Sequence, residues 1–549
     1  MRAQLVIGPL LRYVGAEEAT VWVETDAPCT VEVLGRSSPT FTVAGHHYGI
    51  VCLDGLEPGA CVPYEVRLDG EVRWPEDGDA HPPSVIRTLD PERPLRLAFG
   101  SCRVTVPHEP PHALTKDADD RGREVDALAA LVARMRGQEP SAWPDVLLLV
   151  GDQVYADEVS PATRRLIAAR RGPDGPSSID EVADFEEYTA LYREAWGDPA
   201  TRWLLSTVSS AMIFDDHDVH DDWNTSEAWV REMRAVPWWH ERIVGAYMSY
   251  WLYQHLGNLS PREIAADPVL AELRETADGE PVLRAFAERA EQEVADTRWS
   301  YRRDFGRTRV LVLDSRAGRV LEEDRRQMLS EAEWDWVRES ATGDFDHLLI
   351  ATTLPWLLSP GLHHLEAWNE AVCGGAWGRP AARLGEKLRQ ALDLEHWSAF
   401  HASFLQLSDL IHEVASGAHG PAPASIIVLS GDVHHAYLAE VAFPGRAPTR
   451  SAVVQAVCSP IRNPLDRRER RALGLGLSRP VAATTRLLAR LAGVPVADIR
   501  WRFVAEPTFD NQVGFVELDG RHAKVAIEKT RPEDWAAPQL HLSLSHTIA

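Results

Sequence analysis

Cysteine pairs, long apolar runs and internal repeats are all missing from this sequence of 549 residues. Its six cysteines are scattered without a close pair, which argues against a disulfide framework and indicates reduced thiols. No apolar run approaches the roughly 18 residues that a membrane span requires. The start of the chain also lacks the charged, apolar and small-residue pattern of an export signal. We therefore expect a cytoplasmic protein without a transmembrane segment.

Positive charge is also scarce, since the formal net charge is -25. This balance argues against general affinity for nucleic acid or anionic membranes. An anionic substrate would then require bound cations to offset the repulsion. The hydrophobic content of 45% and the charged content of 25% are those of an ordinary globular protein. The length indicates two or more domains with ample core.

Residues 1–90 consist of short β-type runs separated by glycine, proline and aspartate, as in LDGLEPGACVPYEV. Their alternation predicts half-buried strands in a small β-sandwich of the fibronectin or immunoglobulin kind. The segment contains no convergent chemistry, so a packing or positioning module is favoured over a ligand-binding one. Asp90–Pro94 (DPERP) is the expected linker.

Residues 91–535 alternate apolar strands with helical segments, which predicts an α/β domain built from two mixed sheets with helices outside. A tryptophan-rich helical insertion is expected over Glu227–Trp299. Ile461–Arg502 carries ten arginines against three acids and predicts a basic helical hairpin, either structural or a docking surface for an anionic partner or membrane. Residues 536–549 are expected to be a loose tail.

The stretch Asp145–Asp157 (DVLLLVGDQVYAD) organises this second domain. Val146–Val150 predicts a buried strand, and Gly151 allows the turn that presents Asp152 and Tyr155. Ligands of open α/β sheets bind just past the carboxyl ends of strands. A carboxylate and a phenolate placed there can hold one cation.

Three further apolar strands end in the same way. Cys102 follows Leu95–Phe99, Asp216 and His217 follow Met212–Phe214, and Asp432 and His434 follow Ile426–Leu429. The run DDHDVHDDW also crowds five aspartates into eight positions directly after a strand. Such carboxylates repel one another unless cations neutralise them. A cation site is therefore a better account of this run than a solvated acidic loop.

The chemistry of the donors sorts them into two sites. Thiolate, carboxylate, phenolate and imidazole donors suit a transition metal such as iron, and the residues are Cys102, Asp152, Tyr155 and His434. Asp216 and Asp432, with Asp152 as a bridge, suit calcium, magnesium or manganese. Two such metals can hold a bridging hydroxide for in-line attack on phosphorus.

Four other side chains complete the expected site. His217, beside Asp216, is placed to protonate the leaving alkoxide. Arg103, Arg316 and Arg319 follow strand ends and could offset charge on phosphate oxygens. For each arginine a structural salt bridge is equally compatible with the sequence.

Five motifs together resemble the alkaline phosphatase D (PhoD-like) family of metallophosphoesterases. They are FGSCR at 99–103, GDQVYAD at 151–157, FDDHDV at 214–219, LDSRAGR at 313–319 and SGDVHHA at 430–436. The resemblance implies a two-sheet core related to purple acid phosphatases, with Fe³⁺ at Cys102, Asp152, Tyr155 and His434. It also implies Ca²⁺ at Asp152, Asp216 and Asp432, and hydrolysis of small phosphate monoesters or diesters.

The sequence departs from this family pattern at two points. Many members carry a twin-arginine export signal, and none is visible here. Related metallophosphoesterases also place a histidine ligand after an intermediate strand, whereas HLLIATTLPW at 347–356 has none at its end. We therefore expect the second metal to be held more loosely and to depend on added ions.

Two hypotheses of different classes follow. The first is a two-metal phosphoric ester hydrolase. The second is a binding or scaffold protein with a vestigial metal site, in which the β-sandwich and the basic hairpin carry the function. The intact series of ligand-type residues favours the first.

Overall fold

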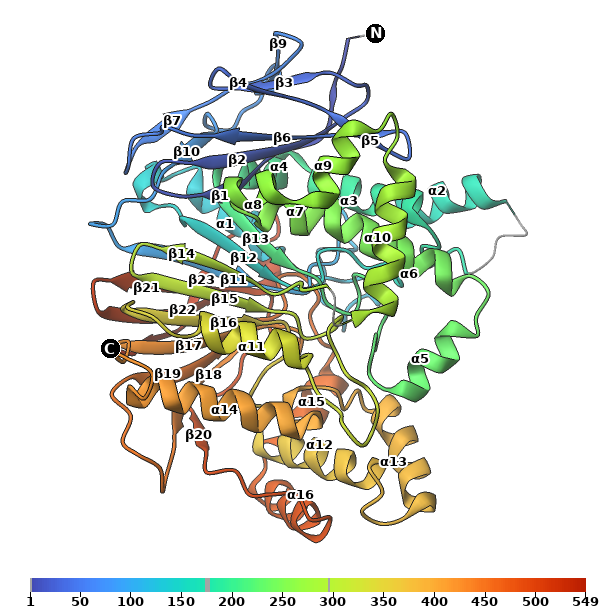
Figure 1. The fold of residues 1–549 in the computed structure, drawn as a ribbon, viewed down its shortest axis with the longest axis vertical. Coiled ribbons are helices and arrows are strands. Elements are labelled where there is room, and N and C mark those ends of the chain that lie inside the picture. Colours follow the sequence, from blue (N-terminus) through green and yellow to red (C-terminus); the bar gives the residue numbers. More distant parts are fainter. Residues whose placement is uncertain (1, 173–177, 295–296) are drawn as a thin grey trace.

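The computed structural model describes residues 2–172, 178–294 and 297–549 (Figure 1). Residue 1 of the predicted sandwich, residues 173–177, and residues 295 and 296 of the predicted insertion lie outside the described residues. Within these ranges the amino-terminal strands lie at one end of the molecule, two large sheets at its centre, and the helices of residues 360–491 at the other end (Figure 1).

The amino-terminal region contains only strands. Antiparallel sheets of order β1-β2-β6-β5 and β4-β3-β8-β9 share a core that includes Val21, Val31 and Val66, and β10 pairs with β7. The strands are β1 (Leu5–Val14), β2 (Ala19–Thr25), β3 (Thr30–Val33), β4 (Arg36–Pro39), β5 (Phe41–Val43), β6 (His46–Leu53), β7 (Cys61–Pro63), β8 (Val66–Leu68), β9 (Glu71–Trp74) and β10 (Val85–Arg87). This arrangement confirms the predicted β-rich start of the chain.

The first central sheet has six strands in the order β13-β12-β11-β21-β22-β23. β11, β12 and β13 run parallel, and the remaining neighbours are antiparallel. The strands are β11 (Leu95–Gly100), β12 (Val146–Val150), β13 (Ser209–Ile213), β21 (Gln512–Asp519), β22 (His522–Lys529) and β23 (His541–Thr547).

The second central sheet has seven strands in the order β14-β15-β16-β17-β19-β18-β20. Its four inner strands, β15, β16, β17 and β19, are parallel. The strands are β14 (Tyr301–Phe305), β15 (Thr308–Leu313), β16 (His347–Thr352), β17 (Ser425–Ser430), β18 (Tyr437–Ala442), β19 (Ala452–Val457) and β20 (Arg500–Phe503). The two mixed sheets confirm the predicted fold class.

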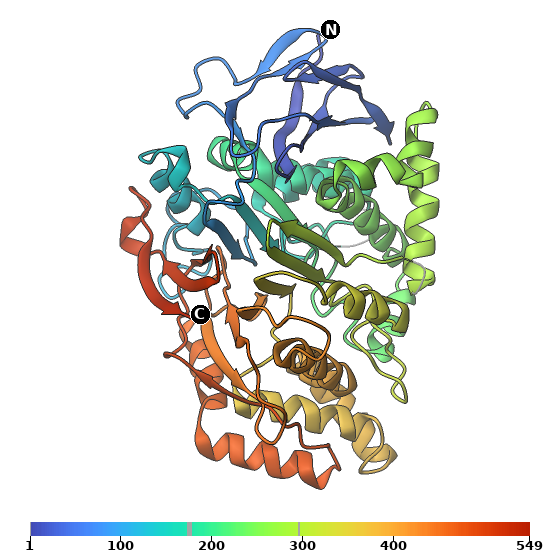
Figure 2. The same ribbon diagram turned by 60° about the vertical axis from the view of Figure 1, so that its left-hand side comes forward.

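Alternation along the strands of the second sheet explains how the layers stack (Figure 2). Val310 and Val312 belong to the core shared with the first sheet, whereas Leu311 and Leu313 belong to a second core under α11 and α14. Successive side chains of a strand point to opposite faces. The second sheet is therefore buried on both faces, which is why its strands are apolar throughout.

Helices cover the outer faces of both sheets and the carboxyl ends of their strands (Figures 1 and 2). They are α1 (Ala127–Met135), α2 (Pro161–Arg171), α3 (Phe185–Gly197), α4 (Pro199–Thr207), α5 (Glu227–Arg234), α6 (Trp239–Ser249), α7 (Leu256–Asn258), α8 (Pro261–Ala266), α9 (Pro268–Glu275), α10 (Glu280–Gln292), α11 (Glu331–Ser340), α12 (Pro360–Cys373), α13 (Arg379–Ala391), α14 (His401–Ser416), α15 (Arg467–Gly476) and α16 (Arg479–Leu491), with a π-helical turn η2 (Tyr250–His255) and short 3₁₀ turns η1 (Pro140–Ala142), η4 (Trp397–Ala399) and η5 (Pro532–Asp534). In the part of the chain that the structure describes, none of the helices is both long and apolar enough to cross a bilayer.

The last residues differ from the expected tail. β23 pairs with β22 over six residues and forms the edge of the first sheet. The alternating HLSLSH of this strand is a period-two pattern, and Leu544 packs against the main core. The expectation of a loose tail over 536–549 was therefore wrong for β23.

A buried arginine ties the amino-terminal strands to the helical insertion. Arg12 of β1 is fully buried and donates hydrogen bonds to the backbone oxygens of Tyr253 (2.6 Å) and Gln254 (2.7 Å) in η2. It also contacts Oδ1 of Asn258 at 3.2 Å. The guanidinium thus satisfies carbonyl oxygens at the end of the π-helical turn, which would otherwise be buried without partners.

A titratable contact joins the same two regions and can be tested by its pH dependence. His46 of β6 lies 2.9 Å from Glu24 and 3.1 Å from Glu186 of α3. Burial alone would lower the pKa of His46, but its hydrogen bonds to the two glutamates raise it to about 9. The resulting stabilisation is fully present below the unfolded pKa of about 6.5 and is lost as pH rises through about 9.

We therefore expect His46→Gln to lower the free energy of unfolding at pH 6 by about 1–2 kcal/mol. The difference between wild type and variant should shrink at pH 10, and chemical denaturation at both pH values measures it. His240→Gln, on the exposed surface of α6, is the matched control. A deficit that stays equal at the two pH values would contradict the ion-pair assignment.

Candidate metal centre

The strand ends that carry the predicted ligands meet at one edge of the two sheets. β11, β12 and β13 are aligned so that their last residues lie side by side, as are those of β16, β17 and β19. A backbone bridge between Arg103 and Arg462 then connects the segment after β11 with the segment after β19. The turns from both sheets therefore converge on one site, in the position that open α/β sheets use for ligands.

Four of the six predicted metal ligands have left-handed backbones: Cys102 (φ 59°), Asp152 (φ 52°), Asp432 (φ 66°) and His434 (φ 51°). This conformation costs a residue with a side chain about 1 kcal/mol or more. Such strain persists only where the surroundings enforce it, and it gathers at functional sites. The surroundings of the predicted ligands therefore hold these turns in a strained conformation.

Carboxylates from different strands gather within ligand distance of one another. In each of three groups of described residues the ligand atoms lie within 4.8 Å: Asp152 with Asp216 and His217, Asp215 with Asp216 and Asp432, and Asp157 with His217 and Asp221. Asp216 belongs to two of these groups. The side chain of Asp152 is almost fully buried. Asp216 thus lies within ligand distance of Asp152 in one group and of Asp432 in another.

Buried oxygens in this cluster lack hydrogen-bond partners among the described residues. They are Oδ1 of Asp152, Oδ2 of Asp215 and Oδ1 of Asp216. Burial, followed by the neighbouring carboxylates, raises the pKa of Asp152 well above its usual range. Buried charges are normally paired or bound to metal ions. Divalent or trivalent cations would provide partners for these carboxylate oxygens and offset the repulsion between them. The donor set therefore fits metal binding.

Asp218 and Gly151 hold the turn after β12 in shape. The carboxylate of Asp218 accepts hydrogen bonds from four backbone N–H groups, those of Asp152 (3.0 Å), Gln153 (3.1 Å), Val154 (3.2 Å) and Asp215 (2.9 Å). Gly151 has φ 107°, and a Cβ there would lie 2.6 Å from Cβ of Asp215. Only glycine permits this close approach of the turns after β12 and β13.

Cys102 and Tyr155 lie next to the carboxylate cluster. The Sγ of Cys102 lies 3.1 Å from the Ser459 hydroxyl, which donates to it, and 3.5 Å from the backbone oxygen of Asp432. Burial and the carboxylates of Asp152 and Asp432 raise the pKa of the thiol well above its usual value. The pKa of Tyr155 is raised in the same way by burial and by Cys102 and Asp152. Both are metal-ligand types that a cation would convert to anions.

His434 extends from the same turn as Asp432 and is half-buried. Burial lowers its pKa to about 3, so the imidazole is neutral, which is the form that binds metal ions. The three carboxylate groups within 4.8 Å contain neither His434 nor Cys102, as far as the described residues go. Their assignment to a metal rests on the resemblance rather than on that distance.

His217 is held by an ion pair on one side and an aromatic ring on the other. Its Nδ1 lies 3.0 Å from Asp157, and its ring stacks on Tyr155 with centroids 4.5 Å apart. Burial by itself lowers the pKa of His217, but Asp157 and Asp216 raise it well above its usual value. The surrounding carboxylates therefore favour the protonated form of the imidazole.

Arg103 does not reach the carboxylate cluster. Its guanidinium donates to Oδ2 of Asp126 (2.9 Å), the backbone oxygen of Ala195 (3.0 Å) and the hydroxyl of Thr201 (3.1 Å). These contacts tie the turn after β11 to α1 and to the helices before β13. The structure therefore argues against the predicted role of Arg103 on phosphate, because its donors are used in packing.

Arg316 and Arg319 lie beneath the cluster with their side chains fully buried. Arg316 forms ion pairs with Asp215 and Glu395, and its Nη2 lies 3.3 Å from Asp216 and 3.5 Å from Asp432. Arg319 pairs with Glu395 at 3.2 Å. A guanidinium enclosed by four carboxylates positions them and cannot touch a substrate from solvent. The predicted contact of Arg316 with phosphate is therefore replaced by a positioning role.

A protein family model matches this chain. The family model described as PhoD-like phosphatase matches residues 130–490, which is more than half of the chain. The chain belongs to the PhoD-like phosphatase family. It is accordingly a phosphatase of the metal-dependent phosphoesterase class. A second model, described as a domain of unknown function (DUF7800), matches residues 2–86, the amino-terminal strands.

Two solved structures are similar to this chain. A structure described as "Structure of PhoD" has a TM-score of 0.60 and 13% identity, and the match covers 99% of this chain and 90% of that one. The purple acid phosphatase PPD1 from yellow lupin (Lupinus luteus) seeds has a TM-score of 0.47 and 10% identity over 98% and 74% of the two chains. A search of curated protein sequences returned no match. The PhoD structure thus supports the fold of this PhoD-like phosphatase.

A histidine that was not predicted from the sequence contacts one of the proposed metal ligands. Nε2 of His396 lies 3.2 Å from Asp432, and its Nδ1 lies 2.7 Å from the buried Glu366 of α12. Burial alone would lower the pKa of His396, but Glu366 and Asp432 raise it well above its usual value. No histidine directly follows β16, and His396 reaches Asp432 from the segment before η4.

Other site residues were also not predicted from the PhoD-like motifs. Asn463 donates to the Tyr155 hydroxyl at 3.2 Å, and Asp157 holds His217. Glu395 and Asn463 lie outside the motifs and reach the site through tertiary contacts. Asp157 and Asp215 lie inside quoted motifs, so their place beside predicted ligands was the available signal.

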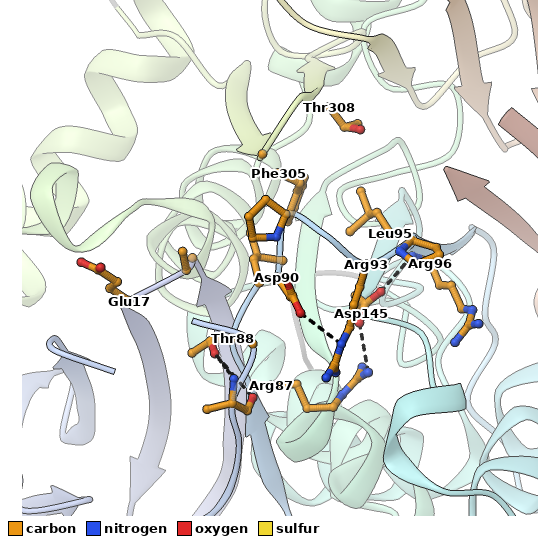
Figure 3. A pocket seen from close by; sticks show the side chains of 18 of the residues that line it. Glu17, Arg87, Thr88, Asp90, Arg93, Leu95, Arg96, Asp145, Phe305 and Thr308 are labelled. Carbon is orange, nitrogen blue, oxygen red and sulfur yellow. Dashed lines mark hydrogen bonds and ion pairs between the residues drawn. The ribbon is translucent and has the colours of Figure 1, made fainter. Parts of the chain in front are cut away.

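A further cavity lies away from this cluster (Figure 3). Its volume is about 990 Å³, and it lies between the amino-terminal strands and the starts of β11 and β15. Arg87 contacts Asp145 at 3.0 Å and Arg93 contacts Asp90 at 3.1 Å, so these charges are already paired (Figure 3). None of the predicted metal ligands lines this cavity, which is at the opposite ends of the strands.

We expect Asp218→Ala to destabilise the folded protein by disrupting the turns after β12 and β13. The substitution leaves four buried backbone N–H groups without their acceptor, at a cost of about 3 kcal/mol or more. Thermal unfolding of the metal-free protein measures the loss. Asp221→Ala, in the same acidic run but exposed, should change stability by less than about 0.5 kcal/mol. Equal effects of the two substitutions would show that Asp218 does not hold the turn.

Proposed function

We propose that this PhoD-like phosphatase hydrolyses small phosphoric esters with a pair of bound cations. Cys102, Asp152, Tyr155 and His434 would hold Fe³⁺, and Asp152, Asp216 and Asp432 would hold Ca²⁺, or Mg²⁺ or Mn²⁺ in its place. The observation that carries the proposal is the set of buried, unpartnered oxygens of Asp152, Asp215 and Asp216. Crowded in this way, they lack the positive charge that a cation pair would provide.

When bound, such cations activate water and neutralise charge on the phosphoryl group. The chain's own residues supply the rest. Arg316 holds Asp215, Asp216 and Asp432 in place, and Asp218 fixes the turn that carries Asp152. These buried groups are preorganised before substrate arrives, so they need no reorganisation during the reaction.

His217 is the proposed general acid. Asp157 accepts from Nδ1, which leaves Nε2 to carry the proton that the departing alkoxide takes up. Stacking on Tyr155 fixes the ring plane. Asp157 is in turn a positioning residue, because it sets the tautomer and orientation of His217 and also accepts from the backbone of Asp221.

Monoester and diester hydrolysis are both compatible with this arrangement. Rates on an aryl phosphate monoester and on a bis-aryl phosphate diester, measured on one preparation, distinguish them. Elemental analysis of the same preparation identifies the two metals.

We expect Asp152→Ala to abolish both metal retention and turnover, because Asp152 is the proposed bridging ligand. Metal content should fall by about one ion or more per chain, and kcat/KM on an aryl phosphate by about 10³-fold or more. Asp119→Ala, on the surface beside Arg121, is the matched control and should change neither. Full activity in Asp152→Ala would rule out the proposed centre.

We expect the effect of His217→Asn to depend on the leaving group. Loss of a general acid slows hydrolysis of an alkyl phosphate by about 10²–10³-fold. The loss should be much smaller for a nitrophenyl phosphate, whose leaving group departs without a proton. Metal content should stay unchanged. A uniform loss on both substrates would assign His217 to binding instead of proton transfer.

A further inference from the structure

A second cavity lies under the basic hairpin, away from the metal centre. Its volume is about 470 Å³, and it is enclosed by α12, α14, α16 and the segment 494–501. This is within the size range of small-molecule sites. The polar and aromatic side chains that line it include His363, His364, His401, Arg486, Arg490 and Trp501. None of the proposed metal ligands lines it.

The charge of this cavity is unusual for a chain with a net charge of -25. α16 contains three arginines, all at exposed positions, and no acidic residue. Arg486 and Arg490 form no ion pair with any described carboxylate. Arg486 donates to Nε2 of His364 at 3.0 Å. Asp498 is the one acidic residue among the described lining residues. Two arginines without carboxylate partners therefore face the same space.

A buried imidazole adds an open hydrogen-bonding atom. His363 is 4% exposed, and its Nδ1 has no partner among the residues described. Its ring packs against Phe404 and Trp501, each with centroids 4.8 Å away. Burial, and then His364 and the other nearby cationic groups, lower its pKa well below the usual value. Buried polar atoms are rarely left unpaired, so this nitrogen points to a missing partner.

The remaining wall of the cavity is apolar. Phe404, Ala489, Val494 and Trp501 contribute to it. The indole N–H of Trp501 donates to the backbone oxygen of Leu358 at 2.9 Å, so its polar atom is already used. A ligand would therefore meet aromatic and aliphatic surface on one side and cationic groups on the other.

We propose that this cavity binds a small amphipathic anion, with its carboxylate on Arg486 and Arg490 and its apolar body against Phe404 and Trp501. Guanidinium groups are the preferred partners of carboxylates, and an apolar pocket with a few convergent polar groups is typical of small-ligand sites. This site is separate from the phosphoesterase centre and gives the basic hairpin a binding role.

Calorimetric titration of the full chain with octanoate tests the proposal. We expect saturable binding of one octanoate per chain with a Kd below about 1 mM. Octanol lacks the charge and acetate lacks the apolar body, so each should bind at least about tenfold more weakly. In the double variant Arg486→Gln/Arg490→Gln the octanoate affinity should fall by at least about tenfold.

Arg479→Gln is the matched control, because Arg479 is exposed at the start of the same helix and does not line the cavity. It should bind octanoate like the wild type. The double variant should retain wild-type phosphate ester hydrolysis, which separates this proposal from the phosphoesterase function. Equal octanoate binding by the wild type and the double variant would overturn it, as would octanol or acetate binding as tightly as octanoate.

Discussion

Repulsion among buried carboxylates is the constraint on which the site depends. Asp152, Asp215, Asp216 and Asp432 come from three different strand ends and from both sheets, yet Asp216 lies within 4.8 Å of each of the other three. The buried guanidinium of Arg316 compensates part of this negative charge. The proposed cations would compensate the rest. A net acidic protein can in this way bind an anionic ester, because its local charge differs from its overall charge.

The fold supplies the rigidity that such a cluster needs. Left-handed turns at Cys102, Asp152 and Asp432 are strained, and the strain is held by surrounding contacts. Asp218 gathers four backbone N–H groups of two turns, and the backbone bridge from Arg103 to Arg462 joins the two sheets. These contacts thus hold like charges close together at a cost in folding stability, as is typical of preorganised active sites.

The strands and several acidic site residues could be predicted from the sequence, and their partners could not. The apolar run Val146–Val150 coincides with β12, and the turn that follows it carries Asp152 as expected. Glu395 and His396 precede no strand motif, and they reach the site only because α12 and the segment after α13 fold back over β17. Arg103 follows Cys102 directly, but neighbouring side chains at a strand end leave in different directions. Sequence position alone therefore could not separate the arginine that packs from the cysteine that faces the cluster.

The order of the first central sheet has a consequence for biosynthesis. β11 lies between β12 and β21, so a strand near residue 100 acquires its second neighbour only when a strand near residue 515 has been made. Contacts this distant in sequence form late and cannot be completed while the carboxyl-terminal segment is still inside the ribosome. Cys102 and its hydroxyl partner Ser459 are separated in the same manner. The turn that carries Cys102 therefore acquires this partner only after the chain has been synthesised past residue 459.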